Sequence, residues 1–92
     1  MSPRPKMPKN ITFSPQATYF KPRGIPMREL DVVHLTHEEM EAVRLYEVEE
    51  LNQTQCAKKM NTSQSTLQRI LDSAHKKIGD ALIHGKAIEI IE

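Results

Sequence analysis

All six prolines of this 92-residue chain lie within its first 26 residues, and no proline follows them. Proline lacks a backbone donor and interrupts helices, so it favours extended or turn conformations. We therefore expect an arm and loop over residues 1–28, and helices only beyond them. The prolines are Pro3, Pro5, Pro8, Pro15, Pro22 and Pro26.

The length and composition indicate one small domain rather than a multi-domain enzyme. Apolar residues make up 38% of the chain, and two Phe, two Tyr and no Trp predict a thin core of aliphatic and Met side chains. No stretch approaches the ~20 apolar residues that cross a bilayer, and the N-terminus lacks the apolar run of a secretory signal. We expect a cytoplasmic, nucleoid-associated protein without membrane contact.

The net charge of +1 conceals a segregation of charge along the chain. Residues 1–28 contain six basic side chains and no acid, whereas residues 29–50 contain eight acids and only Arg44 as a base. Residues 51–92 contain six bases and four acids. Because a local patch is what attracts a polyanion, the near-neutral total does not exclude a nucleic-acid partner.

A capping signal marks the first helix after the arm. Thr36 followed by Glu39 is a capping-box pattern, which predicts a helix over residues 36–50 that ends near Glu49–Leu51. Its apolar residues are spread over more than one face. We expect this helix to pack on two sides within a small bundle.

Two further helices follow. A short helix is predicted over residues 53–60, and Asn61 stops it because Asn tolerates the left-handed backbone conformation. Ser63 caps a helix over 63–82, and Gly85 is its C-terminal stop. The last helix has a continuous apolar stripe at helical spacing, formed by Leu67, Ile70, Leu71, Ala74, Ile78, Ala81 and Leu82.

Residues 86–92 are rich in β-branched side chains and predict a strand. A single strand is not stable alone, so it needs a partner. The two candidates are Ile11–Phe13 of the same chain and the equivalent segment of a second chain. Tyr19 and Phe20 are expected to anchor the intervening loop to the core.

The short helix, the Asn61-Thr62 turn and the next helix form a helix-turn-helix pattern over residues 53–72. In this motif the second helix enters the major groove with its N-terminal half, where Gln reads adenine, Arg reads guanine and Ser reads either base. The base-reading candidates are Gln64, Ser65, Gln68 and Arg69. The phosphate candidates are Ser63, Thr66, Lys58 and Lys76, and the arm residues Arg4, Lys6 and Lys9 extend the footprint.

Two parts of the chain, residues 35–45 and 55–71, resemble the helix-turn-helix of sigma factor region four. A longer resemblance adds Arg4-Pro5-Lys6, residues 19–30 and residues 74–90. It is to domain-of-unknown-function family 134, also called uncharacterised protein family 0251, a set of short prokaryotic proteins thought to bind DNA. This resemblance implies a DNA-binding fold like sigma region four, and it implies no operator or pathway.

The chain departs from these families beside the turns. Glu50 and Asn61 stand where the families usually have Gly, and Thr62 stands where a buried Val is common. We expect a looser or more polar turn with the motif intact. Family members often carry a Cys in the arm, whereas this arm has none, which weakens a metal or redox role.

Other interpretations of the same residues stand beside these. The helix pair is also compatible with an ordinary helical hairpin, and Arg69 with a surface ion pair to Asp72. The basic arm is either a solubilising tail or a minor-groove reader. The acidic run from Glu29 to Glu50 is a solvated helix face, a surface that repels DNA, or a surface for a basic protein partner. The alternative function is a protein-interaction module that contacts RNA polymerase through the acidic helix 36–50.

Metal binding and catalysis lack a supporting pattern. A single cysteine gives neither a disulfide nor a CxxC motif, and the histidines do not have zinc-site spacing. Three scattered glycines do not form a phosphate loop. We therefore expect no metal, no cofactor and no enzymatic activity. The metal-capable residues are His34, His37, Cys56, His75 and His84.

The sequence thus predicts a mainly α fold, a small helical bundle with a helix-turn-helix, an extended Pro-rich N-terminal arm and a short C-terminal β-strand. Its parts are the arm and loop 1–28, the helical domain 29–85 and the strand 86–92. The expected function is sequence-specific binding of double-stranded DNA by a prokaryotic transcription regulator that reads the major groove with helix 63–82. A homodimer would double its contacts, with the C-terminal strand and the long apolar stripe as two alternative dimer seams.

Overall fold

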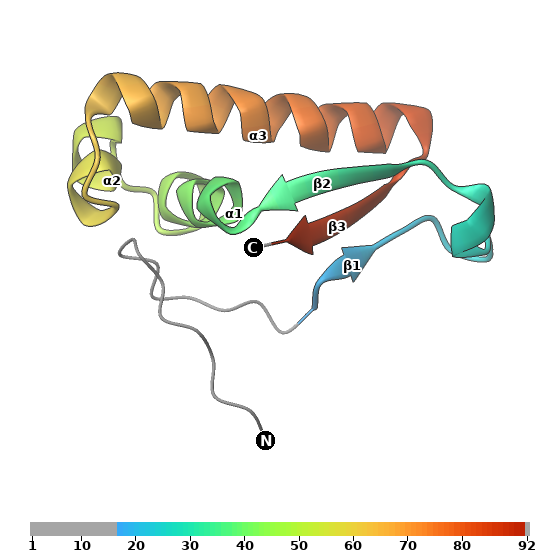
Figure 1. The fold of residues 1–92 in the computed structure, drawn as a ribbon. Coiled ribbons are helices and arrows are strands. Elements are labelled where there is room, and N and C mark those ends of the chain that lie inside the picture. Colours follow the sequence, from blue (N-terminus) through green and yellow to red (C-terminus); the bar gives the residue numbers. More distant parts are fainter. Residues whose placement is uncertain (1–16, 92) are drawn as a thin grey trace.

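The computed structural model describes residues 17–91, in which one long helix lies across a small sheet and two shorter helical segments (Figure 1). The fold is mainly helical, as predicted. The elements follow in the order β1 (Tyr19–Phe20), η1 (Met27–Glu29), β2 (Val32–Thr36), α1 (His37–Val43), η2 (Arg44–Val48), α2 (Gln53–Lys59), α3 (Gln64–His84) and β3 (Ala87–Ile91).

The sheet has the strand order β1-β3-β2, with the C-terminal strand in the centre. β3 runs parallel to β2, with Val32 opposite Ala87, and antiparallel to β1, with Tyr19 opposite Glu89. The predicted C-terminal strand is confirmed, but its neighbours were not predicted. One expected partner, Ile11–Phe13, lies outside the described residues. Because the chain itself pairs both edges of β3, this strand needs no second chain for its hydrogen bonds.

β2 was not predicted from the sequence, and β1 was predicted to be part of a loop. Val32 and Val33 are β-branched residues suited to a strand, but so short a run is stable only beside its partner in the sheet. Tyr19 and Phe20 were expected to anchor a loop to the core; instead they form β1, with 50% and 55% of their surface exposed. They therefore stabilise the fold by pairing with β3 and not by packing in the core.

The first helix begins where predicted. The Thr36 hydroxyl accepts the Glu39 backbone N–H at 3.1 Å, and a Glu39 carboxylate oxygen accepts the Thr36 backbone N–H at 2.9 Å, so the capping box is confirmed. α1 continues into η2, a wider, π-type turn. The helical segment ends at Glu49, and Glu50 follows in the left-handed conformation with φ of 60°.

The helix-turn-helix segment is confirmed in outline. α2 is capped by Asn52, which exchanges hydrogen bonds with Gln55 in a second capping box. Asn61 has φ of 57°, the left-handed conformation predicted for it. The Ser63 hydroxyl caps α3 by accepting the Thr66 N–H at 3.1 Å, and Gly85 ends α3 with φ of 67°.

A single buried cluster fixes α2 against α3. It joins the underside of α3 to α1, η2 and α2 through side chains that are at most 5% exposed. Deleting a buried Leu from such a cluster costs about 2–5 kcal/mol, so the angle between the two helices is strongly determined. The cluster consists of Ala42, Leu45, Cys56, Ala57, Met60, Leu67 and Leu71.

The apolar stripe of α3 is buried or half-buried except at its end. Leu67, Leu71, Ala74 and Ala81 are buried, but Leu82 is 74% exposed, so the prediction was wrong there. Leu82 lies about 100° around the helix from Ala81. The chain that folds back after Gly85 covers only the Ala81 side, where the Lys86 N–H donates to the Ala81 carbonyl at 2.9 Å.

Contacts within the chain occupy most of both dimer seams expected from the sequence. β3 is paired on its two edges, and the stripe of α3 packs on the core and the sheet except at Leu82. Within residues 17–91, no helix is both long enough and apolar enough to cross a membrane.

Candidate nucleic-acid interface

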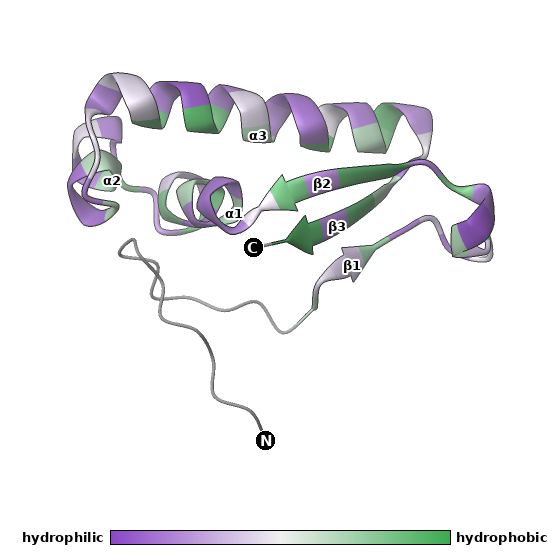
Figure 2. Ribbon diagram, viewed as in Figure 1, coloured by the Kyte–Doolittle hydropathy of each residue, from purple (hydrophilic) through white to green (hydrophobic). Residues whose placement is uncertain are grey.

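The candidate interface consists of α2, the turn after it and the N-terminal half of α3. Figure 2 shows α3 with predominantly hydrophilic residues on the side away from the sheet and hydrophobic residues underneath. Gln64, Ser65, Gln68 and Arg69 are all exposed. At 100° per residue they span an arc of about 140° on the helix, so they form one continuous surface. We call these four residues the polar row.

Three members of the polar row surround a shallow groove together with Gln53 of α2. Gln53 was not among the predicted site residues. It is the first residue of α2, immediately after the Asn52 cap, and recognition of the Asn52–Gln55 capping box would have pointed to it. The groove brings Gln53 beside Gln64, Ser65 and Gln68, so α2 contributes to the same surface as α3.

The side chains of the polar row differ in their partners. The Thr54 hydroxyl donates to the Gln64 amide oxygen at 3.5 Å, and the Gln68 amide nitrogen donates to the Asp72 carboxylate at 3.0 Å. Asp72 therefore binds Gln68, and the alternative ion pair with Arg69 does not form. Within residues 17–91, Arg69 makes no hydrogen bond or ion pair. Its five guanidinium donors remain available to a partner molecule.

The hydroxyl candidates at the start of α3 are partly engaged by the cap itself. The Ser63 hydroxyl accepts from the Thr66 N–H and donates to the Thr66 hydroxyl oxygen at 2.9 Å. Ser65 lies 3.3 Å from the same Ser63 oxygen. In this arrangement the hydroxyl hydrogen of Thr66 is free to donate outward. Thr66 is thus better suited than Ser63 to meet a phosphate oxygen.

The cations around the polar row are exposed, and they have no acid partner among residues 17–91. Lys58, Lys59 and Lys76 have no hydrogen bond or ion pair within the described part of the chain, as is the case for Arg69. Lys77, one residue further along α3, instead donates to a buried carboxylate. The three arm candidates, Arg4, Lys6 and Lys9, lie outside the described residues.

The carboxylates of the acidic segment are largely used within the fold. Glu39 is 6% exposed and accepts hydrogen bonds from Ser73, from the Thr36 N–H and from Lys77. Burial alone would raise the pKa of Glu39, yet these three donors outweigh it and lower the pKa below its ordinary value. The Glu39 side chain thereby ties α1 to the middle of α3.

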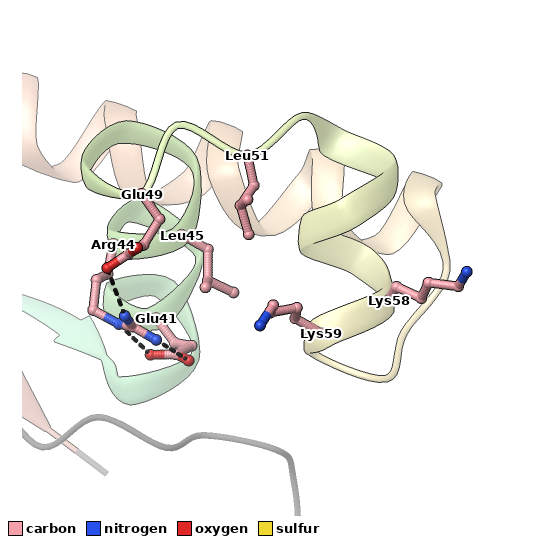
Figure 3. A pocket seen from close by; sticks show the side chains of 7 residues that line it. All are labelled: Glu41, Arg44, Leu45, Glu49, Leu51, Lys58 and Lys59. Atoms are coloured by element: carbon pink, nitrogen blue, oxygen red, sulfur yellow. Dashed lines mark hydrogen bonds and ion pairs between the residues drawn. The ribbon is translucent and has the colours of Figure 1, made fainter.

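A cleft of about 480 Å³ separates η2 from α2, and Figure 3 shows how its side chains lie. Arg44 is held by both oxygens of Glu41, at 3.1 and 3.0 Å, and by Glu49 at 3.3 Å. Hydrogen bonding to Glu41 raises the pKa of Arg44. Lys59 extends into the cleft, whereas Lys58 points away from it. The Arg44 charge is therefore neutralised inside the fold, and Lys58 faces outward.

Within residues 17–91, no group of three His, Cys, Asp or Glu side chains could hold a metal ion. Three of the four histidines lie in separate pairs, His34 with Glu89, His75 with Glu47 and His84 with Asp80. Cys56 is fully buried in the core, and burial raises the pKa of its thiol. Its environment is that of a packing residue.

Comparison with known proteins places the chain in a family. A family model described as "Protein of unknown function DUF134" matches residues 1–92. The chain is 49% identical over 88 residues to a UPF0251 protein of Moorella thermoacetica, covering 96% of this chain and 59% of the relative. It is 51% identical over 88 residues to a UPF0251 protein of Clostridium botulinum strain Hall, covering 96% of this chain and 56% of the relative.

A UPF0251 protein of Thermoanaerobacter pseudethanolicus is 48% identical over 88 residues and is covered over 75% of its length. The chain spans less than two thirds of the Moorella and Clostridium relatives. No solved structure matches it. With a family model that spans all its residues and relatives near 50% identity, this helix-turn-helix chain belongs to the DUF134 family of proteins of unknown function, also named UPF0251.

Proposed function

We propose that this protein binds double-stranded DNA sequence-specifically and regulates transcription, with the N-terminal half of α3 in the major groove. The observation that carries the proposal is the exposed polar row of Gln64, Ser65, Gln68 and Arg69 on the second helix of a helix-turn-helix. Amide, hydroxyl and guanidinium groups are those that hydrogen-bond base edges in this groove.

The charges beside the polar row support the same conclusion. A cation that neutralises a phosphate must be exposed and free of an internal acid. Lys58, Arg69 and Lys76 meet both conditions within the described residues. Phosphate contacts of this kind supply affinity on any sequence, while the base contacts of the polar row supply the preference.

The alternative, a protein-interaction module that uses helix 36–50 against RNA polymerase, receives less support. Glu39 and Glu41 are buried, Glu49 binds Arg44, and Glu47 pairs with His75 at 2.9 Å. These carboxylates contribute to the fold or to local ion pairs. Less of the negative charge of this segment therefore remains for a basic partner.

Selection of duplexes from a random DNA pool, at two salt concentrations, tests the proposal. We expect enrichment of a defined sequence and binding that weakens steeply as salt rises. A palindrome with half-sites about 34 Å apart would indicate a homodimer, and a single site a monomer. Arg69→Ala is compared with the matched control Lys86→Ala. The Lys86 cation is bound to Asp80 at the opposite end of α3. Absence of enrichment at both salt concentrations would contradict the proposal.

A further inference from the structure

Asp72 is an acidic side chain on the outward face of α3, among the cations proposed to approach DNA. We propose that Asp72 is a positioning residue that holds the Gln68 amide in the orientation that reads adenine. This inference rests on the proposed function of α3. It goes beyond that function because it assigns a preference for adenine to Gln68 and explains this preference by the contact with Asp72.

The observation is the hydrogen bond between these two residues. The Gln68 amide nitrogen donates to a carboxylate oxygen of Asp72 at 3.0 Å, one helical turn further along α3. Both residues are exposed on the face that carries the polar row. Within residues 17–91, Asp72 makes no other hydrogen bond or ion pair. The carboxylate is thus dedicated to Gln68.

The chemistry of the pair fixes which way the amide points. An ionised carboxylate only accepts hydrogen bonds, whereas a glutamine amide has two N–H donors on one side and an acceptor oxygen on the other. Turning the amide over would direct its oxygen at the carboxylate. Asp72 therefore holds the Gln68 nitrogen on its own side and leaves the amide oxygen and the second N–H for a ligand.

One donor beside one acceptor is the pattern that adenine requires in the major groove. Adenine offers N7 as an acceptor and N6 as a donor, whereas guanine offers two acceptors, N7 and O6. With its orientation fixed, Gln68 satisfies both groups of adenine and places its oxygen against an acceptor of guanine. The pair thus favours adenine and disfavours guanine.

The charge of Asp72 argues against a merely stabilising role. Asp72 lies between Arg69 and Lys76 on the same face, so its negative charge weakens the attraction of this face for phosphates. A neutral side chain would cap the amide nitrogen without that loss of attraction. The advantage of a carboxylate at this position is that it accepts hydrogen bonds and never donates them.

The experiment begins by locating the base pair that Gln68 reads. Binding of the wild-type protein and of Gln68→Ala is compared on duplexes that are substituted at each position in turn. The position at which Gln68→Ala loses the base preference is the one that Gln68 reads. The ratio of Kd for guanine over adenine at that position is then measured for Asp72→Ala and Asp72→Asn. Thermal unfolding checks folding, which both exposed substitutions should preserve.

We expect three distinct ratios. One good bidentate contact discriminates between bases by roughly 5- to 150-fold. Asp72→Ala should lower the ratio of Kd for guanine over adenine by about 5-fold or more. Binding of both duplexes should tighten, because a negative charge is removed. Asp72→Asn removes the same charge but keeps an acceptor oxygen, so its ratio should lie between those of the wild type and Asp72→Ala. Adding Asp72→Ala to Gln68→Ala should leave the ratio unchanged.

Two results would overturn the inference, and they differ. If Asp72→Ala and Asp72→Asn tighten binding equally and both keep the wild-type ratio, Asp72 acts only through its charge and the proposed function stands. If the wild-type protein shows no base preference at any position, the proposed function itself fails, and the inference fails with it.

Discussion

The long helix α3 has two sides that differ in the partners of their cations. On the side toward α1 and the sheet, Lys77 binds the buried Glu39, and Lys86, just after the helix, binds Asp80 at 2.9 Å. On the outward side, Arg69 and Lys76 have no acid partner within the described residues. A cation bound to an internal carboxylate stabilises the fold, whereas an unpaired cation on an exposed face remains available for a polyanion.

If α3 binds DNA as proposed, this difference separates the residues that stabilise the fold from those that bind DNA on a single helix. Substitutions toward the sheet should change the free energy of unfolding and leave DNA affinity nearly unchanged. Substitutions in the polar row and its neighbouring cations should do the reverse. The buried cluster around Leu67 and Met60 lies under the N-terminal half of α3 and keeps the angle between α2 and α3 fixed.

The largest effect is expected on the side of α3 whose cations are paired. Glu39→Ala removes the capping-box partner of Thr36 and leaves the donors of Ser73 and Lys77 without an acceptor, so the free energy of unfolding should fall by about 2–3 kcal/mol. Chemical denaturation measures it. Glu47→Ala is the matched control, because its ion pair with His75 is half exposed and should contribute at most ~1 kcal/mol. Equal losses for both variants would contradict the importance assigned to Glu39.

The same carboxylate predicts a dependence on pH. The folded-state pKa of Glu39 lies below its ordinary value of 4.5, so its contribution to stability is present above pH 4.5 and is lost as pH falls through the folded pKa. Thermal unfolding of the wild type and Glu39→Gln across this range should therefore converge in acid. A difference in stability between the wild type and Glu39→Gln that stays constant down to pH 2 would show that Glu39 titrates alike in the folded and unfolded states.

The second largest effect is expected on the outward side of α3, whose cations are unpaired within the described residues. Arg69→Ala should weaken binding to the selected duplex by about 1–3 kcal/mol and relax the preference at one base pair. Its melting temperature should stay close to that of the wild type, because Arg69 is exposed and makes no hydrogen bond or ion pair within residues 17–91. An affinity and preference that both stay unchanged would remove Arg69 from the set of base readers.

Lys76 and Lys77 provide a sharper comparison, since they are neighbours on one helix. Lys76→Ala should weaken binding on every duplex alike and lower the salt slope by about 0.9, the value for one phosphate contact. Lys77→Ala should lower stability, because Glu39 then lacks its cation, and should leave the salt slope unchanged. Equal salt slopes for the two variants would contradict the distinction between paired and unpaired cations.

The smallest effect concerns the two left-handed residues. Glu50 and Asn61 have φ of 60° and 57°, a conformation that costs most residues roughly 1–2 kcal/mol and costs Gly and Asn less. Glu50→Gly should therefore raise the free energy of unfolding by up to about 1 kcal/mol, and Asn61→Gly should change it less. Thermal melts of both variants test this order, and a destabilised Glu50→Gly would refute it.

Local signals in the sequence predicted much of the fold. The Thr36–Glu39 capping box, the Ser63 cap and the stops at Asn61 and Gly85 depend on a few consecutive residues, and all four are confirmed. They place the base-reading candidates on an exposed helix face.

Features that depend on distant residues were missed. β2 is a strand only because β3 pairs with it, and the exposure of Leu82 depends on where the chain folds back after α3. Likewise, Gln53 joins the site because α2 packs across the start of α3. The hydrogen bond from Gln68 to Asp72 follows from side-chain orientation, which spacing alone leaves open.

One binding measurement bears most strongly on the proposed role of the unpaired cations. The Kd for the selected duplex is measured against salt concentration for the wild type, for Lys58→Ala/Lys76→Ala and for Lys77→Ala/Lys86→Ala. We predict that the first pair lowers the salt slope by about 1.8, two phosphate contacts at 0.9 each, and that the second pair leaves it unchanged. Equal slopes for all three proteins, or the absence of salt-dependent binding, would contradict DNA binding through the helix-turn-helix face.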